Sequence, residues 1–136
     1  MEFSTTATVL LSWAVHLSSY PAPEQPPRIE FEPRSFFVEY ACSGRDCDAL
    51  GWYNDTGVVY LDERLERHDN VFVRSVIVHE FVHYLQHLSG EFGNSCAEQI
   101  AREREAYAIQ RSYVAEAHGE FAFIRVTHRG CTKRYG

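Results

Sequence analysis

Hydrophobic and polar positions alternate along the chain with two periods, one helical and one typical of strands. From Thr8 to Tyr20 the apolar residues recur every three or four positions, which predicts an amphipathic N-terminal helix. The prolines between residues 21 and 27 then predict an extended connector, because proline restricts its own backbone and that of the residue before it. From Arg28 to Pro33 apolar and charged residues alternate, as they do in a half-buried strand.

Two short apolar segments in the middle of the chain predict a β-hairpin. Residues 51–53 and 58–61 flank the sequence Asn-Asp-Thr-Gly at 54–57, a turn signal with glycine at its end. Residues 35–41 fit either a helix end or a strand, and the pattern does not separate the two. Near the C-terminus, apolar positions between Phe121 and Val126 predict a last strand.

Two longer helices complete the predicted elements. The first runs from Val71 to Leu88, follows Asp69 or Asn70 as its N-cap, and is apolar on most sides, so we expect it to be buried. The second spans Ser95–His118, with the serine as N-cap and Glu98 as its capping-box partner. Helices and strands in this order predict an α+β fold with a short, twisted, mostly antiparallel sheet.

Length and composition limit the function classes. The 136 residues are 45% hydrophobic and 14% aromatic, enough for the core of one domain spanning residues 1–136. A net charge of −6, with dispersed Lys and Arg, gives no basic surface for nucleic acid. No apolar run reaches the length of a membrane span. A signal peptide is the alternative for the first segment, but Glu2 stands there and no basic residue precedes it. We expect a monomer.

The buried helix carries the sequence His79-Glu80-Phe81-Val82-His83, a complete HExxH motif. Residues four apart lie on one face of a helix, so the two histidines can offer ring nitrogens to one metal ion. Glu80 projects about 100° around the helix from His79, beside the metal rather than onto it. The alternative is a buried helix whose His, Glu and His are hydrogen-bonded inside the core.

Three glutamates of the next helix compete to be a third ligand. Glu98 has a role in the helix cap, and Glu105 shares a face with residues 112 and 116, which we expect to be solvated. Glu103 lies beside the apolar stripe that faces the core, where a carboxylate needs a strong partner. We therefore select Glu103, with a salt bridge to a neighbouring arginine as the alternative.

The motif, followed after nineteen residues by Glu103-Arg104-Glu105-Ala106-Tyr107, resembles the gluzincin branch of zincin metallopeptidases. It is also similar to small bacterial zincin-like domains of uncharacterised function with an HE-hydrophobic-x-H-x-x-Q and E-x-E-A-Y pattern, which Gln86 and Tyr107 fit. The resemblance covers about residues 58–110. Tyr107 stands where gluzincins often have an acid that orients a ligand histidine, so the groups around the ligands must differ.

The resemblance implies a small zincin-like domain that holds one zinc ion through His79, His83 and Glu103 and acts on a peptide or protein substrate. Glu80 would be the general base toward a metal-activated water. Tyr107 would either donate to the oxyanion or orient a ligand histidine, and Tyr84 and His87 are further candidate donors. Residues 58–61 would form the strand at the rim of the substrate site, or its neighbour.

Three functions follow as expectations from this motif. The first is a zinc-dependent metallopeptidase that hydrolyses peptide bonds. The second is a zincin-like metal-binding module that is catalytically weak or inactive, since so short a domain has little room for a built-out substrate pocket. The third is an amidase that acts on cell-wall peptides, because the same site hydrolyses any amide.

Four cysteines bear on the compartment. Cys42 and Cys47 are close enough to bridge a loop, and Cys96 and Cys131 could form a second bridge that ties down the tail. Two such bridges favour a secreted or periplasmic protein. Buried, reduced cysteines in a cytosolic protein are the alternative.

Overall fold

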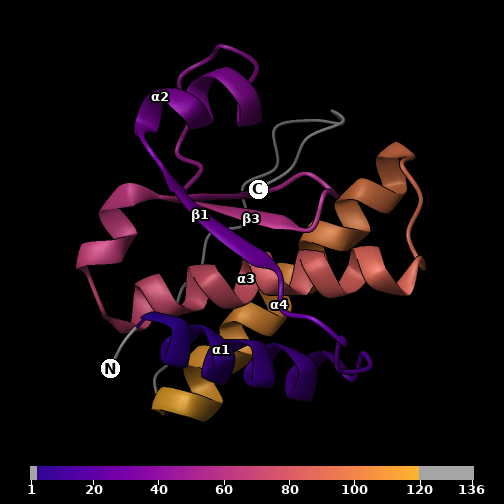
Figure 1. Cartoon of the computed structure of the whole chain (residues 1–136). Helices are drawn as coiled ribbons and strands as arrows, with labels where there is room; N and C mark the ends of the chain where they lie inside the picture. Colours follow the sequence, from indigo (N-terminus) through magenta and orange to yellow (C-terminus); the bar gives the residue numbers. More distant parts are fainter. Residues whose placement is uncertain (1–2, 120–136) are drawn as a thin grey trace.

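The structure, a computed structural model, describes residues 3–119 and consists of helices around a small sheet (Figure 1). In chain order the elements are helix α1 (Phe3–Ser18), strand β1 (Arg28–Glu32), the short helix α2 (Arg34–Phe36) with a π-helical continuation η1 (Phe37–Ala41), strands β2 (Gly51–Tyr53) and β3 (Val58–Asp62), the 3-10 helix η2 (Glu63–Arg67), and helices α3 (Val71–Ser89) and α4 (Cys96–His118). The N-terminal helix, the first strand, the hairpin and both long helices are thus confirmed, and residues 35–41 are helical.

The sheet has the strand order β1-β3-β2 and is mixed. β2 and β3 form the expected antiparallel hairpin, with Trp52 opposite Tyr60. β1 pairs with β3 in parallel over its whole length, from Arg28 opposite Val58 to Glu32 opposite Asp62. The expectation of a mostly antiparallel sheet is therefore wrong. Residues 33–50, which contain helices α2 and η1, connect the end of β1 to the start of β2 at the same end of the sheet, and β3 then runs between these two strands.

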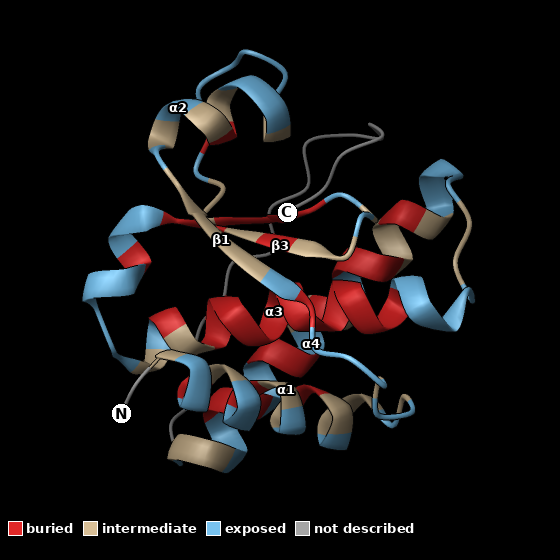
Figure 2. Ribbon diagram, in the orientation of Figure 1, coloured by how far each residue is buried: buried red, intermediate tan, exposed pale blue. Residues whose placement is uncertain are grey.

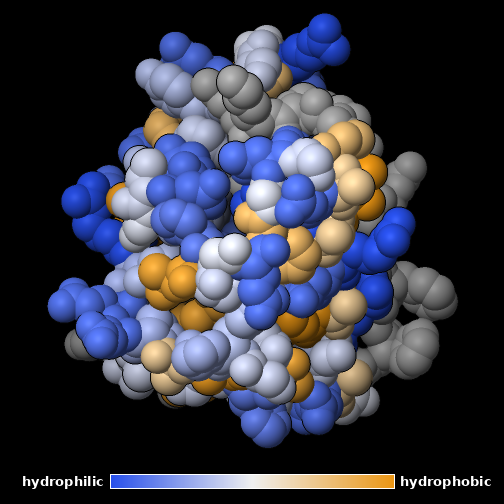
Figure 3. Space-filling view, turned by 90° about the vertical axis from the view of Figure 1, so that its right-hand side faces the viewer, coloured by the Kyte–Doolittle hydropathy of each residue, from blue (hydrophilic) through white to orange (hydrophobic). Residues whose placement is uncertain are grey.

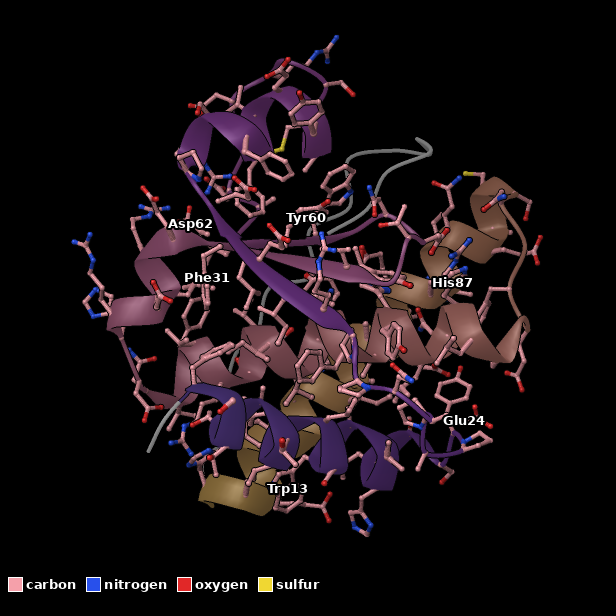
Figure 4. All side chains as sticks on the ribbon, in the orientation of Figure 1. Trp13, Glu24, Phe31, Tyr60, Asp62 and His87 are labelled. Carbon is pink, nitrogen blue, oxygen red and sulfur yellow. A yellow bond between two sulfur atoms is a disulfide. The ribbon has the colours of Figure 1, made fainter. Side chains whose placement is uncertain are left out.

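Helix α3 lies at the centre of the fold, between the sheet and the pair of helices α1 and α4 (Figure 1). Val73 and every residue from Ser75 to Gln86 are buried, which explains the nearly continuous red colour of this helix in Figure 2. On the sheet, strand alternation directs Val59 and Leu61 into this core. Tyr60 lies on the other face, where its ring packs against Phe36 with the ring centroids 4.8 Å apart (Figure 4).

Local signals fix the ends of both long helices. Asn70 caps α3 by accepting a hydrogen bond from the Val73 amide at 2.9 Å, and Ser95 caps α4 by accepting one from the Glu98 amide at 3.1 Å. Both helices end at a glycine in the left-handed conformation, Gly90 with φ 68° and Gly119 with φ 65°. The residues that predicted where the HExxH helix begins and ends thus also form its caps in the structure.

Other expectations concern the loops and the tail. The Cys42–Cys47 disulfide forms, as predicted. The predicted strand at 121–126 and the second cysteine of the predicted Cys96–Cys131 bridge lie outside the described residues. Among helices within residues 3–119, none combines the length and apolar character needed to cross a membrane.

Candidate metal centre

Two imidazoles of α3 and one carboxylate of α4 converge in the core. His79 and His83 lie one turn apart, with their Nε2 atoms 3.2 Å from each other. Oε1 of Glu103 lies 3.1 Å from Nε2 of His79 and 2.9 Å from Nε2 of His83. All three residues are buried, with at most 4% of their surface exposed. The structure thus brings together the three residues that the sequence singled out as ligands.

Hydrogen bonds on the far side of each ring determine where the imidazole protons lie. Nδ1 of His79 is 2.9 Å from Oε1 of Gln110, and Nδ1 of His83 is 2.9 Å from Oε1 of Gln86. An amide oxygen only accepts, so each Nδ1 carries a proton and each Nε2 faces Glu103. Neighbouring groups fix both amides in this orientation.

The Gln86 amide nitrogen donates to the backbone carbonyl of Arg102 at 3.0 Å, and a carbonyl cannot donate. The Gln110 amide nitrogen donates to Oγ of Ser75 at 3.0 Å, and this hydroxyl in turn donates to the Phe72 carbonyl. Neither glutamine can therefore be turned without losing a buried hydrogen bond. Both histidines are held in the tautomer that leaves Nε2 available to a cation.

This donor set fits a zinc ion. Two nitrogen lone pairs and a carboxylate oxygen at mutual distances near 3 Å repel one another unless a positive charge lies between them. Zinc bonds nitrogen and oxygen at about 2.0–2.1 Å, and two ligands on a tetrahedron of that size lie about 3.3 Å apart. The observed separations of 2.9–3.2 Å are close to this value. A tetrahedral ion held by these three described residues would have a fourth position for another ligand, as in catalytic zinc sites.

The charges of His83 and Glu103 shift each other's pKa values in the metal-free site. Burial alone would lower the pKa of His83, but the adjacent Glu103 carboxylate outweighs it and raises this pKa to about 9. Burial would likewise raise the pKa of Glu103, but the charge of His83 and the hydrogen bonds from both rings lower it to about 2. A proton held between His83 and Glu103 therefore balances the metal-free site, and a metal ion must displace it.

Glu80 lies on the side of α3 that faces the sheet. Its side chain is 2% exposed, and among the described residues its Oε1 atom is buried without a hydrogen-bond partner. Gly51 of β2 covers it so closely that a Cβ atom at residue 51 would lie 2.6 Å from Cγ of Glu80. Burial raises the pKa of Glu80 to about 7, near the value suited to a general base at neutral pH.

The other candidates named from the sequence have different surroundings in the structure. The ring of Tyr107 contacts that of His79, with the centroids 4.5 Å apart, so it borders the ligand set. Glu98 accepts from the hydroxyl of Ser95 at 2.8 Å and serves the helix cap, as predicted. Glu105 does not lie on a solvated face as expected, because its carboxylate accepts from Tyr20 at 2.5 Å and from Gln86 at 3.0 Å.

Two residues that shape the site were not found by sequence reasoning. Gln110 lies seven residues after Glu103, which places it on the same face of α4, and this spacing could have revealed it. Gly51 gave no signal beyond its place at the start of a predicted strand. Its role depends on the approach of β2 to α3, which is a tertiary contact.

Comparison of the chain with protein families, curated proteins and solved structures found no match.

Proposed function

We propose that the protein is a zinc-dependent peptidase. The observation that supports this most strongly is the combination of two inward-facing Nε2 atoms and the Glu103 carboxylate with a second buried carboxyl group on Glu80, whose Oε1 has no hydrogen-bond partner among the described residues. A buried metal site that only stabilised the fold would not require an additional buried acid, since burying one without a partner costs several kcal/mol. The cost is understandable if that acid handles a proton during a reaction.

Each residue has a distinct role in this proposal. His79, His83 and Glu103 would hold one zinc ion, and Gln110 and Gln86 would keep the two rings oriented. Zinc, when bound, supplies polarisation of a carbonyl group and lowers the pKa of water to about 7. Glu80 would accept the proton of the attacking water and return it to the leaving amine. Tyr107, whose ring contacts His79, would steady that ligand or donate to the developing oxyanion.

The sheet supports a peptide as substrate. β2 is an edge strand of the described sheet, and Gly51 at its start lies against Glu80. The Asp62 amide donates to the Leu50 carbonyl, so the alternation of an antiparallel pair turns the backbone groups of residues 51 and 53 away from β3. The backbone groups of Gly51 therefore face away from β3, where they could bind an extended peptide next to the proposed base. Strand β3 is then the neighbour of the rim strand, one of the two positions expected from the sequence.

A metal-binding module without turnover is the second candidate, and burial favours it. The three ligands and Glu80 are each at least 96% buried, since their exposed fractions are 4%, 2%, 4% and 2%. Such burial is typical of sites that hold a metal to stabilise a fold. The Cys42–Cys47 disulfide is consistent with an oxidising compartment for either function.

Hydrolysis of an unstructured protein such as casein decides between the two candidates. The zinc-loaded protein is expected to cleave casein, to lose this activity in a chelator and to regain it on addition of zinc. Glu80→Gln is expected to keep stoichiometric zinc while losing about 100-fold or more in kcat. A zinc-loaded wild-type protein that cleaves nothing would leave the metal-binding module as the function. Full activity of the Glu80→Gln variant would end the assignment of the base.

A further inference from the structure

Beyond the metal ligands, a third histidine of α3 lies on the same side of the helix. At 100° per residue, His87 is rotated about 40° from His83 and about 20° from Glu80. On the surface of α3 it therefore lies between the side that carries His79 and His83, which faces α4, and the side that carries Glu80, which faces β2. Figure 4 shows His87 where the last turns of α3 approach the beginning of α4.

A buried tyrosine of the sheet holds this exposed imidazole. The hydroxyl of Tyr53 lies 2.6 Å from Nδ1 of His87, and the Gly57 amide donates to the same hydroxyl at 3.1 Å. Because the phenol oxygen already accepts from Gly57, and a phenol is the stronger donor, its proton is directed to Nδ1. The proton of the neutral imidazole is then on Nε2.

Packing around Tyr53 keeps this arrangement rigid. The Tyr53 side chain is 1% exposed, and its ring packs edge to face on Tyr84 with the centroids 5.9 Å apart. The Tyr84 hydroxyl is itself engaged, since it donates to the Gln25 carbonyl at 2.8 Å. His87 is exposed, so a fixed N–H donor is presented to solvent. The end of the molecule that carries it, seen face-on in Figure 3, has mostly hydrophilic residues with small hydrophobic areas between them.

The spacing relates this donor to the proposed reaction site. Gly51 contacts Glu80, and Tyr53, two residues along the same strand, contacts His87. The two contacts are about 7 Å apart along β2 and about 10 Å apart along α3. An extended peptide advances about 3.3 Å per residue, so this distance corresponds to two or three residues of a bound chain.

From this geometry we propose that His87 is a substrate-binding residue and that Tyr53 positions it. Its Nε2–H donates to a carbonyl or carboxylate oxygen of the bound peptide, two or three residues from the bond that is cleaved. The proposal rests on a peptide being the ligand of the metal centre, as argued above. It assigns His87 to recognition at a distance from the cleaved bond and not to the oxyanion.

Binding measured in the absence of turnover tests the proposal. Zinc-loaded Glu80→Gln protein is titrated calorimetrically with peptides of about two and about eight residues, of which only the longer can reach His87. Adding His87→Phe, which keeps a ring but removes the donor, is expected to weaken binding of the longer peptide about tenfold and leave the shorter one unchanged. Adding His87→Gln, which keeps an N–H near Nε2, is expected to restore most of the affinity. His68→Phe, at an exposed histidine after η2, is the matched control.

Further arms identify the acceptor and the positioning role. The longer peptide is made with a C-terminal acid and with a C-terminal amide. If His87→Phe weakens binding of both forms equally, the acceptor is a main-chain carbonyl. If it weakens binding of the acid alone, the acceptor is the terminal carboxylate. In the turnover-competent background, Tyr53→Phe and His87→Phe are expected to raise KM with little change in kcat. NMR of ¹⁵N-labelled histidine is expected to show the proton of His87 on Nε2, and in the Tyr53→Phe variant to show a mixture of tautomers.

Two results would overturn the assignment. One is unchanged affinity of the longer peptide for the His87→Phe protein, and the other is an NMR signal that places the proton on Nδ1. The proposed peptidase function can fail independently of this assignment. If the wild-type protein binds the longer peptide through His87 but never cleaves it, recognition stands and hydrolysis does not.

Discussion

Replacing Glu80 by glutamine is expected to change the stability of the metal-free protein in a pH-dependent way. Burial raises the pKa of this carboxyl from 4.5 to about 7 in the folded protein. As pH rises from 4.5 to about 7, the unfolded chain loses this proton while the folded protein keeps it, so the folded state becomes less stable. At about 1.4 kcal/mol per pH unit, the wild-type protein loses about 3 kcal/mol through this one group. Glutamine cannot titrate and does not incur this loss.

The measurement is urea unfolding in a chelator, followed by the fluorescence of Trp13 and Trp52, at several values between about pH 4 and about pH 8. Relative to wild type, the Glu80→Gln protein is expected to gain about 3 kcal/mol between the two ends of this range. Any pH-independent effect of the new amide cancels in this comparison. Glu66→Gln, at an exposed glutamate of η2, controls for the loss of one carboxylate. A difference between wild type and Glu80→Gln that stays constant with pH would refute the reasoning that the acid is buried and protonated.

Four other substitutions test the site and the fold around it. Gln86→Ala and Gln110→Ala are expected to lower zinc affinity by about 10–100-fold, measured by competition with a chromogenic chelator, because each frees a ligand ring; unchanged affinity in both would show that the amides do not orient the rings. Gly51→Ala places a methyl group against Glu80 and is expected to cost about 1–3 kcal/mol in urea unfolding, whereas wild-type stability would mean that β2 does not pack so closely. Asp62→Asn is expected to destabilise the fold by roughly 2–4 kcal/mol, because this fully buried carboxylate pairs with Arg34 and Arg64, and a loss within measurement error would contradict that role.

Much of the site was predictable because its parts are local in sequence. The spacing of His79 and His83 on one helix is a property of helix geometry alone. Asn70 and Ser95 are typical N-cap residues, and their side chains cap the beginnings of α3 and α4. The choice of Glu103 followed from its place beside apolar residues of α4, and the structure places that carboxylate between the two rings.

What the sequence did not predict depends on contacts between distant segments. The parallel pairing of β1 with β3 depends on β3 lying between β1 and β2, and the sequence of the three strands does not indicate that order. The hydrogen bond of Glu105 to Tyr20 depends on how the connector after α1 passes α4, and its hydrogen bond to Gln86 depends on how α3 packs against α4. The contact between Tyr53 and His87 requires β2 to lie along α3, and nothing in either segment indicates it alone.

Anomalous diffraction at the zinc absorption edge tests the central claim most directly. In crystals of the protein grown with one equivalent of zinc, we expect a single strong peak about 2.0–2.2 Å from Nε2 of His79, Nε2 of His83 and a carboxylate oxygen of Glu103. The Nδ1 atoms of both rings should remain hydrogen-bonded to the two glutamines. Zinc bound elsewhere, or a map with no peak among these three side chains, would contradict the metal centre and the function proposed from it.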